Sequence, residues 1–431
     1  MSMIYLLLYG LVLLVVLVFY VRRQRRVQAA HADELQRSIA GGLVEPPSLH
    51  PVIDPLRCIG SGSCARACPE EALGVVGGKA VLKNGAACIG HGACLSACPV
   101  EAIKLVFGSE LRGIDIPNIS RDFETNVPGI FIAGELGGMG LIRKAAEQGR
   151  QAMEAIRRRK GEGDDLDVLI VGCGPAGLSA GLSAIENGLR YRIVEQEDSL
   201  GGTVYHYPRH KVTMTAPVNL ALVGKVKFGE VRKEALLEFW NGVVARTGLQ
   251  ISFRERMEGI DRLGDGFVVR TSLGSHRTRS VLLAMGRRGT PRKLEVPGEE
   301  TSKVVYRLVD PSQYAGRSVV VVGGGDSALE AAIAVSEQPG AEVILSYRGE
   351  AFSRVKARNR EALEQRRQQG RLRVLLGSQV RSIEQRSVHL EHQGRIERLD
   401  NDAVIVCAGG LLPTPLLRQI GIEFDTKFGT G

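Results

Sequence analysis

Two cysteine runs constrain this chain more than any other feature. Six of its eight cysteines form two runs of identical spacing: Cys58, Cys64 and Cys68, and 30 residues later Cys88, Cys94 and Cys98. Each run ends in Cys-Pro and soon continues into Glu-Ala-Leu or Glu-Ala-Ile, where we expect a short helix. Regular, closely spaced cysteines form disulfides or bind metal. Two equal halves predict a pseudo-twofold module with two equivalent sites.

The N-terminal segment indicates whether these cysteines form disulfides or bind metal. Met3–Val21 is an uninterrupted apolar run of 19 residues, which as a helix spans about 28 Å, close to the hydrocarbon thickness of a bilayer. Arginines 22, 23, 25 and 26 follow it. The positive-inside rule then predicts a single-pass protein of the cytoplasmic membrane, with its other domains in the cytoplasm. A cleaved signal peptide is the alternative, with Ala30-His31-Ala32 as a weak cleavage site, but its basic residues would precede the apolar run. In a reducing cytoplasm the cysteines should bind metal.

The cysteine-rich segment resembles the two-cluster ferredoxins. That family uses Cys-x2-Cys-x2-Cys-x3-Cys-Pro twice, and the fourth thiolate of each run crosses to the other cluster. Here the second cysteine of each run is replaced, by Ser61 and by His91. The resemblance implies two iron–sulfur clusters, [4Fe–4S] or [3Fe–4S]. One would be held by Cys58, Cys64 and Cys98 with Ser61 at the vacant corner, the other by Cys68, Cys88 and Cys94 with His91 at the corner.

Two interpretations of the vacant corners stay open. Three thiolates can hold a three-iron cluster, or His91, and less plausibly Ser61, ligates a fourth iron. An imidazole in place of a thiolate removes a negative charge and should raise the reduction potential, as in Rieske centres. A module without metal is disfavoured because all six cysteines keep their register. Zinc is disfavoured because zinc ribbons pair Cys-x2-Cys knuckles, and this sequence has none.

Further along, the chain twice follows the order strand, glycine turn, helix. Residues 167–171 form a strand that leads into a Gly-x-Gly-x-x-Gly turn and a helix to about residue 187, and a second strand, 191–194, ends at Glu195. In this context the motif is the dinucleotide fingerprint: the turn and the helix N-terminus take a pyrophosphate, and the carboxylate takes ribose hydroxyls. We therefore expect FAD to contact Gly172, Gly174, Pro175, Ala176, Gly177, Glu195, the second turn Gly201-Gly202-Thr203, and Gly286.

The second occurrence should bind the nicotinamide cofactor. A strand at 318–322 precedes Gly323-Gly324-Gly325, and Asp326, Ser327 and Ala328 open the next helix. The following strand ends in Ser-Tyr-Arg348, with Arg354 shortly after and no acidic residue at its tip. A guanidinium there suits a 2′-phosphate, so we expect NADPH, with NADH as the alternative. The basic stretch 360–373 is typical of a solvated helix face.

The order of these motifs resembles that of the thioredoxin-reductase-like flavoproteins, and most closely their bacillithiol-disulfide-reductase-like branch. In that family a final segment Thr-Asn-x-Pro-Gly-Ile-Phe-x-Ala-Gly-Asp contacts the flavin. Here the segment runs from Thr125 to Glu135 and precedes the first fingerprint. The resemblance therefore implies a circularly permuted flavin domain, in which Gly134 and Glu135 reach the flavin. Permutation is tolerated because domain termini often lie close together. The family also implies a homodimer.

No residue stands out as a catalytic nucleophile. Thioredoxin reductases carry a Cys-x-x-Cys pair before their second glycine motif, and residues 306–316 here contain no cysteine. Cys173, in the first glycine turn, is either a reactive thiol activated by a helix N-terminus or a small residue packed under the pyrophosphate. His206 and His210 are either proton donors or surface and substrate-gate residues.

These observations predict an α/β protein with two Rossmann-like, three-layer folds for FAD and NAD(P), a small α+β ferredoxin-like module and one N-terminal transmembrane helix. The expected boundaries are 1–21 membrane helix, 22–50 linker, 51–107 iron–sulfur module, 108–160 permuted FAD segment, 161–297 FAD domain, 298–406 NAD(P) domain and 407–431 return to the FAD domain. We expect an NAD(P)H:acceptor oxidoreductase whose partner is an electron-transfer protein or a small redox acceptor. The alternatives are a low-molecular-weight disulfide reductase that uses Cys173 and a membrane-tethered redox sensor. The net charge of +9 is explained by local clusters, and we expect no nucleic-acid binding.

Overall fold

The computed structural model describes residues 2–40, 46, 49–109, 113–138, 140–161, 163–207, 212–215, 217–287, 289–352, 355–411 and 413–429. The chain divides into two compact units, and each is described by itself. The first comprises 1–113, 351–360 and 427–431, and the second comprises 114–350 and 361–426. Of the predicted site residues, Arg354 lies outside the described residues, as does His210.

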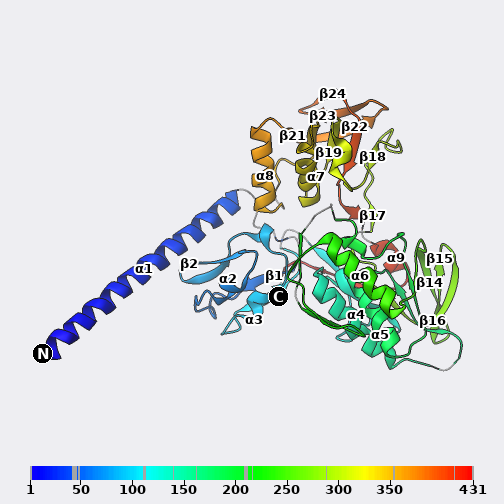
Figure 1. Cartoon of the computed structure of the whole chain (residues 1–431), viewed down its shortest axis with the longest axis horizontal. Helices are drawn as coiled ribbons and strands as arrows, with labels where there is room; N and C mark the ends of the chain where they lie inside the picture. Colours follow the sequence, from blue (N-terminus) through cyan, green and yellow to red (C-terminus); the bar gives the residue numbers. More distant parts are fainter. Residues whose placement is uncertain are drawn as a thin grey trace. The chain divides into compact units, whose positions relative to one another are not determined.

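The first unit contains one long helix and the cysteine-rich module (Figure 1). Its elements are α1 (Ser2–Ala40), β1 (His50–Ile53), α2 (Ser63–Ala67), β2 (Leu73–Val76), β3 (Lys79–Leu82), a 3₁₀ turn (Gly85–Ala87), α3 (Ala93–Ser96) and β4 (Ile103–Val106). β1 pairs antiparallel with β4, and β2 with β3. The segments after each Cys-Pro are therefore strands β2 and β4, and the expected short helices are absent there. The short helices α2 and α3 lie earlier and carry the middle cysteine of each run.

The structure contradicts the membrane helix predicted for the N-terminal segment, which is the first half of helix α1. No helix in the described part of the chain has an apolar stretch long enough to cross a membrane. The predicted membrane span over residues 3–21, and the single-pass, cytoplasm-facing localisation drawn from it, are therefore wrong.

The helix also continues through most of the predicted linker, 22–50. Its C-terminal half contacts the cysteine-rich module through polar side chains. His31 Nδ1 accepts a hydrogen bond from Val75 N (3.1 Å), and Glu34 pairs with the buried Lys83 ammonium (2.5 Å). These contacts with β2 and the segment after β3 give this polar stretch a surface to pack against.

The second unit begins with a seven-stranded sheet in the order β13-β8-β7-β16-β15-β14, with β6 also pairing with β16. The members are β6 (Ile130–Ile132), β7 (Leu166–Val171), β8 (Tyr191–Val194), β13 (Ile251–Ser252), β14 (Met257–Leu263), β15 (Gly266–Thr271) and β16 (Gly274–Leu283). β6, β7, β8 and β13 run parallel to their neighbours, and β14, β15 and β16 form an antiparallel meander.

Strand residues alternate between two buried faces, as period-two geometry requires. Val168, Ile170 and Leu282 pack with helices α4 (Ile142–Arg157), α5 (Pro175–Glu186) and α6 (Lys233–Thr247). Leu169 and Leu283 pack instead with the meander and with Leu417 of helix α9 (Thr414–Gln419). Both faces are covered, which explains the nearly continuous apolar strands.

The second sheet has the order β18-β25-β19-β20-β21 and is wholly parallel. Its strands are β18 (Val304–Val305), β19 (Ser318–Val322), β20 (Glu342–Tyr347), β21 (Leu372–Leu376) and β25 (Ala403–Val406), with helix α7 (Asp326–Ser336) after β19. An antiparallel meander of β22 (Ser378–Ile383), β23 (Ser387–His392) and β24 (Arg395–Asp400) precedes β25. Helix α8 (Ala357–Gln368) carries the basic stretch, whose Arg366 and Arg367 pair with Glu337 and Glu364, as expected of a solvated face.

Short strand pairs complete this unit: β5 (Ile114–Pro117) with β27 (Phe424–Lys427), β9 (Val212–Met214) with β12 (Glu230–Arg232), β10 (Val218–Leu220) with β11 (Gly224–Val226), and β17 (Thr290–Pro291) with β26 (Gly410–Leu411). Single 3₁₀ turns lie at Gly134–Gly137, Gly202–Val204 and Pro311–Tyr314. The α/β prediction with two nucleotide-binding folds is confirmed.

Candidate functional sites

The carboxyl ends of four parallel strands bring the predicted flavin residues together. Ala284, after β16, donates its N–H to Val171 O at the end of β7 (2.9 Å), and Ala133, after β6, donates to Leu283 O (3.2 Å). Gly172 N donates to Val194 O at the end of β8 (2.8 Å). The turns that follow these strands therefore share one edge of the sheet, where open α/β folds bind their ligands.

The first glycine turn is shaped by close backbone contacts. Gly174 caps helix α5, and Pro175 takes its first position, where a missing N–H costs nothing. A Cβ on Gly177 would lie 1.9 Å from Gly172 O, whereas a Cβ on Gly174 would meet only Gly202 Cα, at 3.9 Å. The third glycine thus allows helix and strand to touch. Gly174, the second glycine of the motif, leaves space beside the other glycine turn, Gly201-Gly202-Thr203. This space lies at the N-terminus of a helix and therefore suits a pyrophosphate.

Glu195 is held in place at the end of β8. Its carboxylate is buried and accepts hydrogen bonds from Cys173 N (2.9 Å) and Glu197 N (3.0 Å). These two bonds orient a carboxylate at the strand tip next to the glycine turn. This is the arrangement expected for an acceptor of ribose hydroxyls.

Gly134 and Glu135 lie at the same edge of the sheet, although they come before the fingerprint in sequence. Gly134 has φ +83° and donates its N–H to Gln148 Oε1 of helix α4 (2.9 Å). Glu135 Oε2 lies 3.8 Å from the position of a Cβ on Gly286. Gln148 was not predicted from the sequence, because its role depends on this long-range packing.

Cys173 is fully buried. Burial, followed by the neighbouring Glu195 carboxylate, raises the pKa of its thiol far above the usual range. The thiolate is the nucleophilic form of cysteine, so the surroundings of Cys173 favour the packed, unreactive interpretation. His206 is half-buried and contacts Arg307 and, at 3.7 Å, the Glu197 carboxylate.

The second glycine turn, between β19 and α7, repeats the design of the first. Gly323 has φ +145°, and a Cβ there would lie 2.4 Å from Cys407 O. A Cβ on Gly324 would lie 2.2 Å from the ring of Tyr347, at the end of β20. Gly325 caps helix α7, which opens with Asp326, Ser327 and Ala328. Arg348 follows Tyr347 and is exposed.

The six cysteines of the first unit form the two groups that the crossing rule predicts. Cys58, Cys64 and Cys98 line one cavity together with Ser61. Burial raises the pKa of Cys64, and the negative charges of Cys58 and Cys98 contribute in the same direction. Backbone N–H groups of Gly60 and Ala80 point at Cys58 Sγ, both at 3.4 Å. Buried sulfurs that accept amide hydrogen bonds are suited to hold a cluster.

The second group consists of Cys68, Cys88 and Cys94. Burial raises the pKa of Cys94 to about 11, and Cys88 and Cys68 add to the shift. His91 is half-buried, and its Nε2 atom is buried without a hydrogen-bond partner among the described residues. Burial lowers the pKa of His91, which keeps the imidazole neutral, the form that binds metal.

In the described part of the chain no three His, Cys, Asp or Glu side chains converge on a point that would hold a single metal ion. A cluster distributes its ligands over several irons, so the two cysteine groups do not need such convergence. The cavity, the two groups of three thiols and the unpartnered imidazole nitrogen fit clusters.

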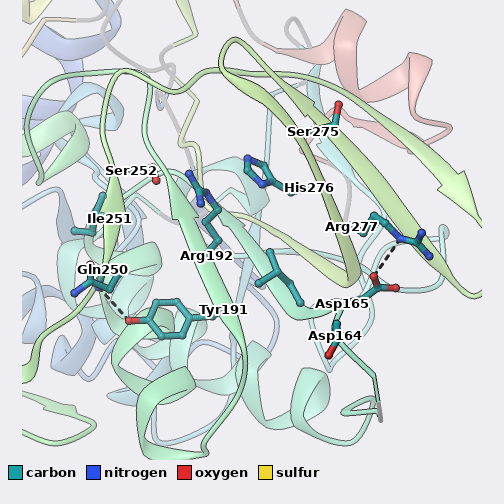
Figure 2. A pocket seen from close by; sticks show the side chains of 11 residues that line it. Asp164, Asp165, Tyr191, Arg192, Gln250, Ile251, Ser252, Ser275, His276 and Arg277 are labelled. Carbon is teal, nitrogen blue, oxygen red and sulfur yellow. Dashed lines mark hydrogen bonds and ion pairs between the residues drawn. The ribbon is translucent and has the colours of Figure 1, made fainter.

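A cavity of about 520 Å³ lies elsewhere, at the amino ends of β7 and β8 (Figure 2). It is bordered by Tyr191, which accepts a hydrogen bond from Gln250 N (3.1 Å), and by an Arg277–Asp165 ion pair (3.1 Å). Since it lies at the opposite end of these strands from the glycine turns, it is not the nucleotide site. Beside it the buried Glu255 carboxylate binds Arg192, His276 and Thr271 at 2.5–3.1 Å.

The folds and turns thus define an α/β oxidoreductase with separate flavin and nicotinamide domains and an iron–sulfur domain. The family model described as pyridine nucleotide-disulphide oxidoreductase matches residues 169–428, and one described as 4Fe-4S dicluster domain matches residues 50–99. The chain belongs to the pyridine nucleotide-disulphide oxidoreductase family. It is an FAD-dependent NAD(P)H oxidoreductase with an iron–sulfur domain.

Individual relatives agree with this assignment. The chain is 33% identical over 274 residues to a ferredoxin–NADP reductase of Thermus thermophilus, covering 61% of this chain and 78% of the relative. It is 28% identical over 268 residues to bacilliredoxin reductase Bdr of Bacillus subtilis, covering 61% and 82%. Among solved structures, the bacillithiol disulfide reductase Bdr of Bacillus cereus matches with a TM-score of 0.54 and 25% identity, covering 61% of this chain and 83% of that structure.

Proposed function

We propose that this enzyme oxidises NADPH and delivers the electrons through its flavin and its own iron–sulfur clusters to an electron-transfer protein. The carrying observation is the presence, in one chain, of a flavin fold in which the Cys173 thiol is buried with a raised pKa and of two groups of three cysteines that fit clusters. Bound flavin accepts a hydride and gives up electrons one at a time, which clusters can accept. The Thermus thermophilus relative is named for ferredoxin, which supports a ferredoxin-type partner.

The chain's own residues would hold these groups as follows. The two glycine turns and the N-terminus of helix α5 would hold the FAD pyrophosphate, and Glu195 the ribose. Gly134, Glu135 and Gly286, which adjoin at the same edge, would line the rest of the flavin site. The turn Gly323–Gly325 and the start of α7 would hold the nicotinamide cofactor. The exposed Arg348 guanidinium, at the tip of β20, favours NADPH over NADH because it can pair with a 2′-phosphate.

We also infer that the flavin domain is circularly permuted. Strand β6 and helix α4 precede the fingerprint, yet β6 pairs with β16 in the central sheet, and a Cβ on Gly149 of α4 would lie 2.1 Å from Ala176 O. The far end of the chain adjoins this segment: Asn126 Nδ2 donates to Gly421 O (2.8 Å), and Glu423 N donates to Asn126 Oδ1 (2.9 Å). A rearranged chain with residues 114–160 attached after residue 426 should bind FAD equally well.

Two other functions remain as alternatives. A disulfide reductase that uses Cys173 requires a thiolate that the buried site disfavours. A redox sensor would bind NADPH tightly but show negligible turnover with every acceptor. The homodimer predicted from the family is a separate proposal, which light scattering of the purified protein tests.

Anaerobic addition of NADPH to the purified protein tests the main proposal. We expect bleaching of the flavin absorption together with a change in the cluster signals in low-temperature EPR. Flavin bleaching with unchanged cluster signals after several minutes would refute delivery through the clusters. It would leave an NADPH-dependent flavoprotein whose iron–sulfur domain has another role.

A further inference from the structure

The two loops that lack the second cysteine have the same backbone conformation. Gly60 and Gly62 have φ of +70° and +68°, and Gly90 and Gly92 have +77° and +78°. In each loop the first of these glycines hydrogen-bonds the sulfur of the cysteine two residues before it. Positive φ is rarely open to other residues, so the match is specific. The residue between the two glycines therefore has the same place in both halves of the module.

The position between the two glycines lies next to a cysteine group. In the first half it is occupied by Ser61, which lines the cavity of Cys58, Cys64 and Cys98. The matching backbone of the second loop predicts that His91 adjoins the group of Cys68, Cys88 and Cys94 in the same way.

The two residues differ in how their polar atoms are satisfied. Ser61 is exposed, and its hydroxyl already bonds within the loop, to Ser63 Oγ at 3.3 Å and to Ser63 N at 3.4 Å. His91 presents a buried Nε2 with no partner among the described residues. Buried polar atoms almost always have a partner, so this nitrogen requires one that the described residues do not supply.

We propose that His91 is the fourth protein ligand of the cluster on Cys68, Cys88 and Cys94, whereas Ser61 does not ligate the cluster on Cys58, Cys64 and Cys98. This inference rests on the proposed function, because it needs clusters in both groups. The neutral imidazole gives its Nε2 lone pair to an iron and keeps its proton on Nδ1. The second site then holds a four-iron cluster with one thiolate fewer than usual, and the first site holds a three-iron cluster. The two sites are thus chemically distinct, although the repeat looks symmetric.

The test uses the full-length protein, purified without oxygen, and reads iron content and nitrogen coupling. We expect about seven irons per chain, the sum of a three-iron and a four-iron cluster. Pulsed EPR of the dithionite-reduced protein should show a strong nitrogen coupling that changes when histidine is labelled with ¹⁵N. His91→Cys should keep about seven irons but abolish that coupling, and His91→Ala should leave about six. Ser61→Ala is the matched control and should change neither quantity.

Several results would overturn the inference. A reduced cluster without histidine coupling in the wild type, or a coupling that survives in His91→Cys, excludes His91 as a ligand. Loss of iron in Ser61→Ala contradicts the assigned asymmetry. The proposed function fails separately: a cluster that shows histidine coupling but is not reduced by NADPH refutes electron delivery and leaves the ligand assignment intact.

Discussion

Alanine substitutions at two glycines of the first turn should have opposite effects on folding and on flavin binding. A Cβ on Gly177 would lie 1.9 Å from Gly172 O and 3.5 Å from Ala284 Cβ. The first of these atoms belongs to the backbone of the same turn and cannot move aside as a flexible side chain could. At Gly174 the φ of −71° is normal for alanine, and the nearest atom to the new methyl is Gly202 Cα at 3.9 Å.

Gly177→Ala should therefore lower stability by about 1–3 kcal/mol, the usual cost of overpacking. At about 2–4 °C per kcal/mol for a domain of this size, the melting temperature of the flavin-free protein should fall by roughly 2–12 °C. Gly174→Ala should leave that melting temperature unchanged. Its methyl fills space where the pyrophosphate would lie, so we expect the flavin dissociation constant to rise at least about ten-fold, or about 1.4 kcal/mol.

The assay compares thermal unfolding of both variants after removal of flavin, followed by titration with FAD. The flavin-free state is required because bound ligand itself raises the melting temperature. An unchanged melting temperature in Gly177→Ala, or undiminished FAD binding in Gly174→Ala, would show that the glycines do not have these separate roles.

Three further variants test other parts of the protein. Cys173→Ser should leave NADPH oxidation within about two-fold of wild type in a stopped-flow assay, since a buried thiol with a raised pKa supplies no thiolate; loss of turnover would revive the disulfide-reductase alternative. Arg348→Ala should raise the KM for NADPH roughly ten-fold and leave that for NADH unchanged, because only the 2′-phosphate interaction is lost; equal effects on both would contradict it. Burial raises the pKa of the Glu255 carboxyl, but its hydrogen bonds outweigh burial and hold this pKa below the usual value of 4.5. Stability from this carboxylate is therefore present above pH 4.5 and is lost as pH falls through the lower folded pKa. Glu255→Gln should lower the free energy of unfolding by about 1–3 kcal/mol at pH 7, and the melting temperature should then fall less steeply as the pH becomes acidic. An unchanged fall at acidic pH would show that another group controls the acid sensitivity.

The sequence allowed the nucleotide folds and the cysteine groups to be predicted because both depend on short-range rules. A glycine turn between a buried strand and a helix is imposed by local sterics, and parallel strands bring their carboxyl ends to one edge wherever they lie in the chain. The grouping of Cys98 with Cys58 and Cys64 is implied by the resemblance to two-cluster ferredoxins and their crossing rule, and the cavity that these three cysteines line agrees with it.

The N-terminal segment could not be predicted in the same way. A hydropathy pattern measures composition and does not show what a helix contacts. Helix α1 continues past its arginines because His31 and Glu34 find partners in the cysteine-rich module, 44 and 49 residues further along the chain. Nothing near these residues in sequence identifies those partners. The same is true of Glu255, whose network depends on strands that come together only in the folded sheet.

If the flavin domain is permuted as proposed, the order of its motifs constrains the fold less than their geometry does. Strand β6 pairs with β16 through backbone hydrogen bonds such as that from Val281 N to Gly129 O (2.9 Å). These bonds require β6 to lie beside β16 in space, wherever β6 occurs in the sequence. Asn126 bonds to residues 295 and 297 positions away, so one side chain joins the segment before the fingerprint to the segment after the second sheet. Under the proposed permutation, the original peptide connection would have been lost at this junction and a new one made elsewhere on the domain. Such a rearrangement requires both ends of the cut to lie at the same place on the domain, and the bonds of Asn126 to Gly421 and Glu423 support this.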